Sequence, residues 1–317
     1  MATEHNYQAT QNNTNMTPGD PMEKDFSNQN VRQFSAADDV TLSGNPYHLG
    51  DHMDSDTALK RIRTAGSISI SPELFEKIYL SPQNQVKGDL RKTFANPTPL
   101  ALVGFLISLS PLSCDLMGLR GAGGNGAAGT ATYFFFGGLL MILGGVGEWV
   151  IGNTFPFVVF TSFGAFWLGF AGTLQPFYGA YAAYSLNPEA PAEGLATVGF
   201  NSSFGFFTLS MGILCFIYLI LAMRTNVVFV IIFLTLVVAF GCLTGAYWNL
   251  SLGNASLAGT LIITAGAFCF ITCACGWYIF FAIMLAALDF PFQIPVGDLS
   301  TMIKGASQKA KERESAV

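Results

Sequence analysis

Two short segments of this chain place prolines, amides and a carboxylate within long apolar stretches. The first reads Asn-Pro-Thr-Pro-Leu from Asn96 to Leu100. Asn96 can cap a helix, and Pro97 and Pro99 fit a first turn, where backbone N–H groups lack helical partners. The segment therefore predicts a helix start near residue 97. If that start lies inside a membrane pathway, its free N–H groups can also attract an anion.

The second segment runs from Glu148 to Thr154 and ends an apolar run in a Gly-Asn-Thr turn. Asn153 or Thr154 can cap the helix that follows. An ionisable group in or near a membrane span favours a functional role, such as carrying a proton. A glutamate at a membrane boundary can also extend its carboxylate to water. The sequence leaves both interpretations of Glu148 open.

Charge is concentrated at the two ends of the chain, which has 317 residues, 15 of them basic and 20 acidic. Residues 1–92 and 289–317 carry most of it, and residues 93–288 contain Asp115, Arg120, Glu148, Glu189, Glu193 and Arg224. So few charges could not cover a water-soluble domain, which excludes a soluble enzyme as the main body. The net charge of −5 argues against a nucleic-acid partner.

No cofactor or metal is expected from the residue types in the apolar region. The three histidines all precede residue 53, and the six cysteines lie inside apolar stretches, where thiols act as small apolar residues. Neither a nucleophile–base set nor a cofactor-binding loop is recognisable, so we expect no enzymatic activity.

Six apolar windows are long enough to cross a bilayer, which takes about 20 residues. They span about 97–118, 131–150, 155–175, 200–222, 226–248 and 257–287. The expected fold is an all-α membrane protein with a six-helix transmembrane bundle over residues 93–290. Its glycines predict close helix packing.

The flanking segments are predicted from composition and charge. Residues 1–66 are polar and indicate a disordered tail. Residues 67–92 form a juxtamembrane segment with an amphipathic helix after Ser71. Residues 291–317 form a C-terminal tail. The cations that flank the spans place both tails in the cytoplasm, and they are Lys87, Arg91, Lys92, Arg224, Lys304 and Lys309.

Three segments in register with these spans resemble the acetate uptake transporter family, also called succinate–acetate permeases. Asn96-Pro-Thr-Pro-Leu-Ala-Leu resembles the family's Asn-Pro-Ala-Pro-Leu-Gly-Leu signature. Glu148-Trp-Val-Ile-Gly-Asn-Thr-Phe is similar to its Glu-x-x-x-Gly-Asn-Thr-Phe. Phe160-Thr-Ser-Phe-Gly-Ala-Phe-Trp is similar to its Phe-Thr-Ser-Tyr-Gly-Ser-Phe-Trp, and the segment Ser69-Ile-Ser-Ile-Ser-Pro-Glu-Leu resembles the tails of fungal members.

The resemblance implies a six-helix protomer with its own pore, assembled into a hexamer in the plasma membrane. It implies transport of acetate and related short carboxylates, coupled to protons in fungi. It also implies a narrow apolar constriction formed by Phe105, Phe163 and Leu234. Phe163 stands where the family motif has tyrosine, so a hydroxyl that could bind a carboxylate is missing at this position.

The predicted spans contain no Lys, Arg or His that could offset the cost of burying a carboxylate, which is on the order of 20 kcal/mol in the idealised case. We therefore expect a route lined by uncharged donors, among them Asn96, Asn153 and Thr154, with Glu148 as the candidate proton carrier. The alternatives are a passive anion channel of the same architecture, an ammonium or neutral-solute channel, and a membrane sensor that transports nothing.

Overall fold

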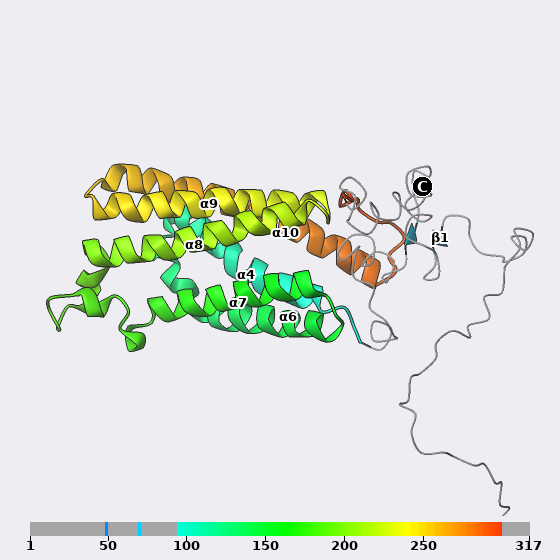
Figure 1. Ribbon diagram of the computed structural model, residues 1–317, viewed down its shortest axis with the longest axis horizontal. Coiled ribbons are helices and arrows are strands. Elements are labelled where there is room, and N and C mark those ends of the chain that lie inside the picture. The colour runs from blue at the N-terminus through cyan, green and yellow to red at the C-terminus, as the bar shows by residue number, and fades with distance from the viewer. Residues whose placement is uncertain (1–47, 50–68, 71–93, 300–317) are drawn as a thin grey trace, which may run out of the picture. The chain divides into compact units, whose positions relative to one another are not determined.

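The computed structural model describes residues 48–49, 69–70 and 94–299, and its long elements are helices (Figure 1). In this part of the chain six helices are long and apolar enough to cross a membrane. They are α4 (Thr98–Met117), the segment Gly126–Val150 that ends in α6 (Met141–Val150), α7 (Thr154–Leu174), α8 (Val198–Ala222), α9 (Val227–Ser251) and α10 (Ala255–Ala287). The prediction of six spans is confirmed.

The remaining described elements are short. They are β1 (His48–Leu49), β2 (Ser69–Ile70), η2 (Leu119–Gly121), η3 (Gly124–Gly129), α5 (Thr130–Thr132), η4 (Tyr133–Leu140), η5 (Pro176–Tyr178), η6 (Ala182–Tyr184) and η7 (Pro191–Ala196). β1 and β2 pair in parallel over two residues each. The amphipathic helix expected after Ser71 and most of both tails lie outside the described residues.

The second span is not a uniform α-helix. Its central residues Tyr133–Leu140 form a π-helix, between α5 and α6. Inside this span Tyr133 is fully buried, donates its hydroxyl to the Gly126 carbonyl at 2.9 Å and stacks on Trp167. The wider π turn therefore lies where the second span packs on α7.

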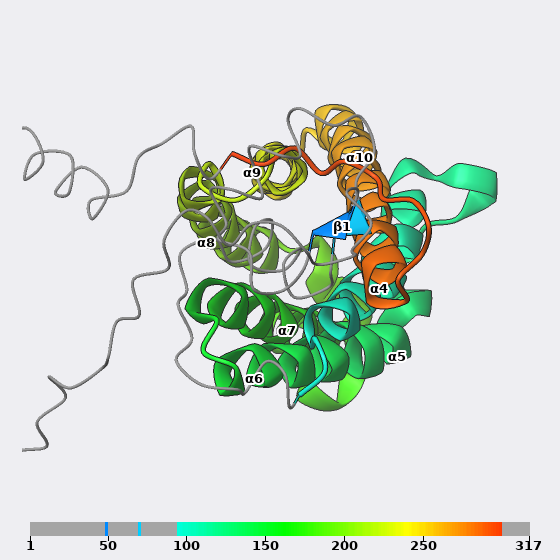
Figure 2. The ribbon, with the colours of Figure 1, turned by 90° about the vertical axis from the view of Figure 1, so that its right-hand side faces the viewer.

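The helices form two groups that α4 and α10 join (Figure 2). In one group α4, α6 and α7 pack together, and in the other α8, α9 and α10 do so. α7 and α8 face each other across a wider seam. Phenylalanine and tyrosine side chains from α7, α8 and α9 meet in this seam.

Glycines bring helix backbones into contact within the first group. A Cβ atom added at Gly144 of α6 would lie 2.7 Å from Ala101 Cβ and 2.8 Å from Ala101 N of α4. A Cβ added at Gly169 of α7 would meet no atom within 4 Å. The two glycines thus differ in packing, because a neighbouring helix occupies the space of a side chain at Gly144 and not at Gly169.

We expect Gly144→Ala to destabilise the protein by about 1–3 kcal/mol, because the methyl group meets the backbone of α4, which cannot move aside alone. Gly169→Ala is the matched control and should leave stability unchanged or raise it by up to about 1 kcal/mol through helix propensity. The midpoint of thermal unfolding of purified protein in detergent measures both. Equal midpoints for the two variants would contradict the packing described for Gly144.

Residues 291–299, which the sequence assigned to a tail, run back onto the ends of α9 and α10. The N–H of Val227 donates to the Gly297 carbonyl at 2.8 Å, and the N–H of Leu299 donates to Thr225 at 3.0 Å. The Tyr278 hydroxyl donates to the Pro295 carbonyl at 2.6 Å. The folded part of the chain therefore continues beyond the predicted boundary at residue 290.

Candidate functional site: a buried carboxylate at the end of an aromatic route

Glu148, near the C-terminal end of α6, is 0% exposed. One carboxylate oxygen accepts a hydrogen bond from the Thr98 hydroxyl. The other accepts a hydrogen bond from the Asn153 side-chain amide at 2.6 Å. We call Thr98, Glu148 and Asn153 the carboxylate cluster. The carboxylate does not extend to water, so the interpretation of Glu148 as a boundary glutamate with a solvent-exposed carboxylate is wrong.

Local sequence explains how three separate segments meet at this cluster. The Thr98 N–H donates to Asn96 Oδ1 at 2.9 Å, which fixes the start of α4 as the Asn-Pro motif predicts. A left-handed turn at Gly152 (φ 84°), a conformation that glycine adopts readily, lets the Asn153 N–H reach the Glu148 carbonyl at 2.8 Å. Pro97 lies over Gly147, where a Cβ would come within 2.6 Å of the ring. α4 can therefore approach α6 closely enough for Thr98 to bond the carboxylate.

The structure brings together only part of the predicted pathway set. Glu148 and Asn153 touch, and Asn96 positions Thr98, with Pro97 and Pro99 on either side in the chain. Asn153 precedes α7, but its side chain makes no capping bond. Its amide donates to the Glu148 carboxylate instead, because a buried acceptor needs hydrogen-bond donors. Thr154 begins α7 with an exposed side chain, away from the cluster.

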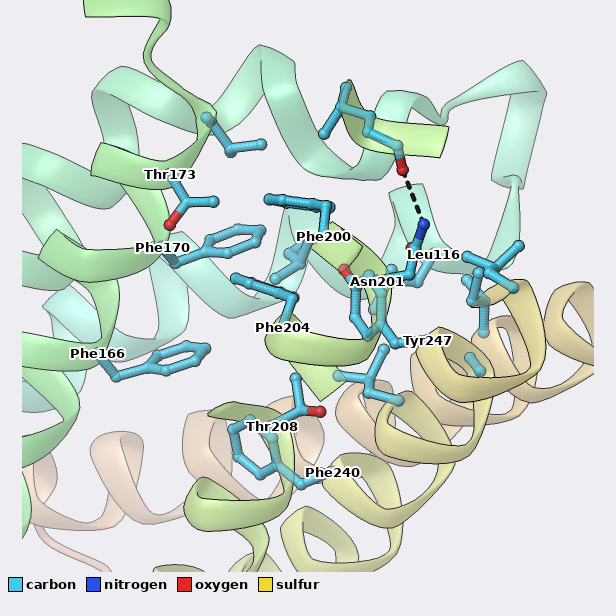
Figure 3. Close-up of a pocket in the computed structure, with 17 residues that line it drawn as sticks. Leu116, Phe166, Phe170, Thr173, Phe200, Asn201, Phe204, Thr208, Phe240 and Tyr247 are labelled. Atoms are coloured by element: carbon cyan, nitrogen blue, oxygen red, sulfur yellow. Dashed lines mark hydrogen bonds between the residues drawn. The ribbon is translucent and has the colours of Figure 1, made fainter. Parts of the chain in front are cut away.

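Three cavities follow one another along α4, α7 and α9. The first has a volume of about 120 Å³, and one water needs roughly 10–15 Å³, so it has room for several (Figure 3). Its lining is aromatic with a few polar groups, among them Phe166, Phe170, Thr173, Phe200, Asn201, Phe204, Thr208, Phe240 and Tyr247. The second, of about 40 Å³, shares Leu112, Leu116, Phe166, Phe240 and Leu243 with the first.

The third cavity, of about 20 Å³, leads to the carboxylate cluster. It is lined by Thr98, Phe155, Pro156, Val159, Phe160, Phe229 and Phe233. Because Thr98 also bonds Glu148, the cluster lies at the end of the line of cavities. The three cavities lie in one line through the bundle, with volumes that fall toward the carboxylate, and we call this line the route.

A connected set of rings separates the second cavity from the third. We call it the aromatic neck, and its members are Phe105, Phe155, Phe163, Tyr218 and Phe233. Ring centroids lie 6.2 Å apart for Phe105 and Phe163, 6.4 Å for Phe163 and Tyr218, 5.5 Å for Tyr218 and Phe233, and 6.0 Å for Phe155 and Tyr218. The neck thus joins α4, α7, α8 and α9.

A model of a known protein family matches the larger part of the chain. The model described as the GPR1/FUN34/yaaH family matches residues 80–301. The chain belongs to this family. The expectation drawn from the three motifs is thereby confirmed.

Members of the GPR1/FUN34/yaaH family and one solved structure show what the chain is similar to. It is 44% identical to "Protein alcS" of Aspergillus fumigatus, over 77% of this chain and 90% of that protein. It is 32% identical to "Acetate permease A" of Emericella nidulans, over 71% of this chain and 73% of that protein. The structure of the bacterial acetate channel SatP superposes with a TM-score of 0.50 at 26% identity, covering 64% of this chain and 99% of that chain.

One residue expected at the constriction of this family member is not there. Phe105 and Phe163 meet as expected, but Leu234 is 49% exposed on the surface of the protomer. Leu236, two positions along α9 and 3% exposed, lines the second cavity together with both phenylalanines. Two positions rotate a side chain by more than half a helical turn, so Leu234 faces away from the cavities, and Leu236 is the leucine that lies beside Phe105 and Phe163.

Sequence reasoning missed Thr98, Phe155, Tyr218 and Phe233. Thr98 carries a signal, since it departs from the alanine of the family signature and adds a hydroxyl. Tyr218 also carries one, as a hydroxyl-bearing ring in an apolar span. Phe155 and Phe233 carry none, because phenylalanine is abundant throughout the spans.

Proposed function

We propose that this chain is a multi-pass transporter of the plasma membrane that carries acetate and related short carboxylates together with protons. The observation that carries the proposal is the fully buried Glu148 carboxylate at the narrow end of a route through the bundle. A family that includes a protein named acetate permease supports the substrate class.

Physical chemistry links this site to coupled transport. A carboxylate crossing the aromatic neck loses hydration, and none of the described residues that line the three cavities is a cation that could replace it. A proton that moves with the substrate makes the step electrically neutral overall and so lowers this cost. Glu148, bonded by Thr98 and Asn153, is the acidic group adjacent to the route that can take and release such a proton.

Initial rates of labelled acetate uptake into vesicles with the purified protein test the proposal. We expect a carrier-dependent rate that rises when the outside is made one pH unit more acidic. Uncharged acetic acid also crosses lipid, so rates in protein-free vesicles are subtracted. Uptake that follows membrane voltage and ignores the proton gradient would instead indicate a passive anion channel. Flux of ammonium without acetate would indicate the ammonium channel, and no flux of any solute would indicate a sensor.

We also infer that the protein forms a homo-hexamer with both termini in the cytoplasm. Large apolar side chains cover the outside of the protomer, and glycines such as Gly241 face open space there, as a helix interface in lipid requires. Light scattering of the detergent-purified protein gives the number of copies. Protease access to terminal tags in right-side-out vesicles gives the orientation.

A further inference from the structure

The aromatic neck contains one polar atom among its five rings. Phe105, Phe155, Phe163 and Phe233 present only carbon and hydrogen, whereas Tyr218 of α8 carries a hydroxyl. The Tyr218 side chain is buried, and its ring contacts three of the four phenylalanines. Two of these, Phe155 and Phe233, line the third cavity, and Phe163 lines the second. The hydroxyl therefore belongs to a ring that lies between the two cavities.

Among the residues that the structure describes, this hydroxyl has one hydrogen-bond partner, which lies across the seam between α7 and α8. Tyr218 Oη lies 3.0 Å from Ser162 Oγ, and either atom can be the donor. The Ser162 hydroxyl also lies 2.9 Å from the Val159 carbonyl, which accepts its proton. A serine hydroxyl has one proton, so in this arrangement Tyr218 donates to Ser162. The phenolic proton is thus held by a single neutral hydrogen bond.

Such a proton can be redirected without cost to the fold. Rotation about the phenolic C–O bond moves the proton and leaves the ring in place. The Ser162 oxygen keeps its own bond to Val159, so releasing Tyr218 leaves no donor without a partner. A hydrogen bond to an ionised carboxylate is about twice as strong as one between neutral groups, so a passing anion outcompetes Ser162.

We propose that the Tyr218 hydroxyl donates a hydrogen bond to the substrate carboxylate as it crosses the aromatic neck, and that Tyr218 thereby determines preference for small carboxylates. This rests on the proposed function and deepens it. A neutral donor suits the task because it replaces part of the lost hydration and still releases the anion. A buried cation would hold the substrate too tightly for rapid passage.

The variant Tyr218→Phe removes the hydroxyl and keeps the ring. We expect the KM for acetate to rise about tenfold, the loss of one hydrogen bond to a charged group. Ser162→Ala is the matched control: it removes the same bond across the seam but leaves the phenolic proton free for substrate. We expect its KM for acetate to stay at or below the wild-type value. The double variant Tyr218→Phe/Phe163→Tyr returns a hydroxyl to the adjacent ring and should restore at least part of the affinity.

The outcomes separate this inference from the proposed function. If wild-type protein carries acetate and Tyr218→Phe has the same KM, the inference is overturned and the function stands. If Ser162→Ala loses as much affinity as Tyr218→Phe, the bond between α7 and α8 is structural and the inference is again overturned. If wild-type vesicles carry no acetate, both fall together. Elution as a single species on size exclusion confirms that each variant is folded.

Discussion

Glu148→Gln should remove the dependence of acetate uptake on the proton gradient and leave the fold intact. Glutamine has nearly the same shape and keeps an oxygen that can accept from Thr98. The Asn153 amide can turn to present its own oxygen to the new amino group. The side chain can no longer take up or release a proton. A gradient of one pH unit corresponds to about 1.4 kcal/mol per proton, or tenfold in rate or accumulation at most. We expect the ratio of acetate uptake with the proton gradient to uptake without it to be near one in the variant.

The measurement compares initial acetate uptake with and without an inward proton gradient, after subtraction of protein-free vesicles. Glu189→Gln is the matched control, because it makes the same chemical change at an exposed acid in the loop between α7 and α8. It should respond to the gradient as the wild type does. A Glu148→Gln protein that keeps the wild-type response would show that another group carries the proton, or that none is carried.

Removing one donor of the carboxylate cluster is a different change, because it alters the hydrogen bonds to Glu148 and leaves the titratable group in place. In Glu148→Gln the cluster keeps its hydrogen bonds but loses its titratable group. Loss of an Asn153 or Thr98 side chain would keep the titratable group and leave a buried carboxylate oxygen short of a donor. The proposed role of Glu148 therefore depends on groups that only the folded chain supplies.

The sequence predicted the spans well because the length of apolar chain needed to cross lipid is fixed. It also predicted the start of α4, since Asn96 and the prolines act through neighbouring residues only. The partners of Glu148 could be predicted only in part. Asn153 is five residues away, but Thr98 is fifty residues away, and their contact depends on how α4 packs against α6 through Gly147.

The errors occur where the sequence lacks periodicity. α9 is apolar on every side, so nothing in its pattern shows which face lines the route. Leu234 and Leu236 are chemically identical choices, and only the packed structure distinguishes them. The π-helix Tyr133–Leu140 is similar, because nothing in its residue types indicates a wider turn, and in the structure it packs against both α4 and α7.

Phe163→Ala should widen the range of carboxylates that cross the aromatic neck. Phe163 meets Phe105 edge-on, with 6.2 Å between the ring centroids, and lines the second cavity, so its removal widens the aromatic neck. A pocket that excludes one extra methylene discriminates by roughly 10- to 200-fold, so we expect the rate for butyrate relative to acetate to rise at least about tenfold. Initial uptake rates of labelled butyrate and labelled acetate, measured in parallel, give the ratio.

Two controls locate the effect in the neck. Phe177→Ala makes the same substitution at an exposed ring outside the bundle, and Leu234→Ala truncates the residue that faces away from the route. Both should keep the wild-type ratio. Loss of a buried phenylalanine costs about 3–5 kcal/mol, so Phe163→Leu serves where the alanine variant is unstable, with a smaller shift in the same direction. An unchanged ratio in folded Phe163 variants, or an equal shift in Leu234→Ala, would place the size filter elsewhere on the route.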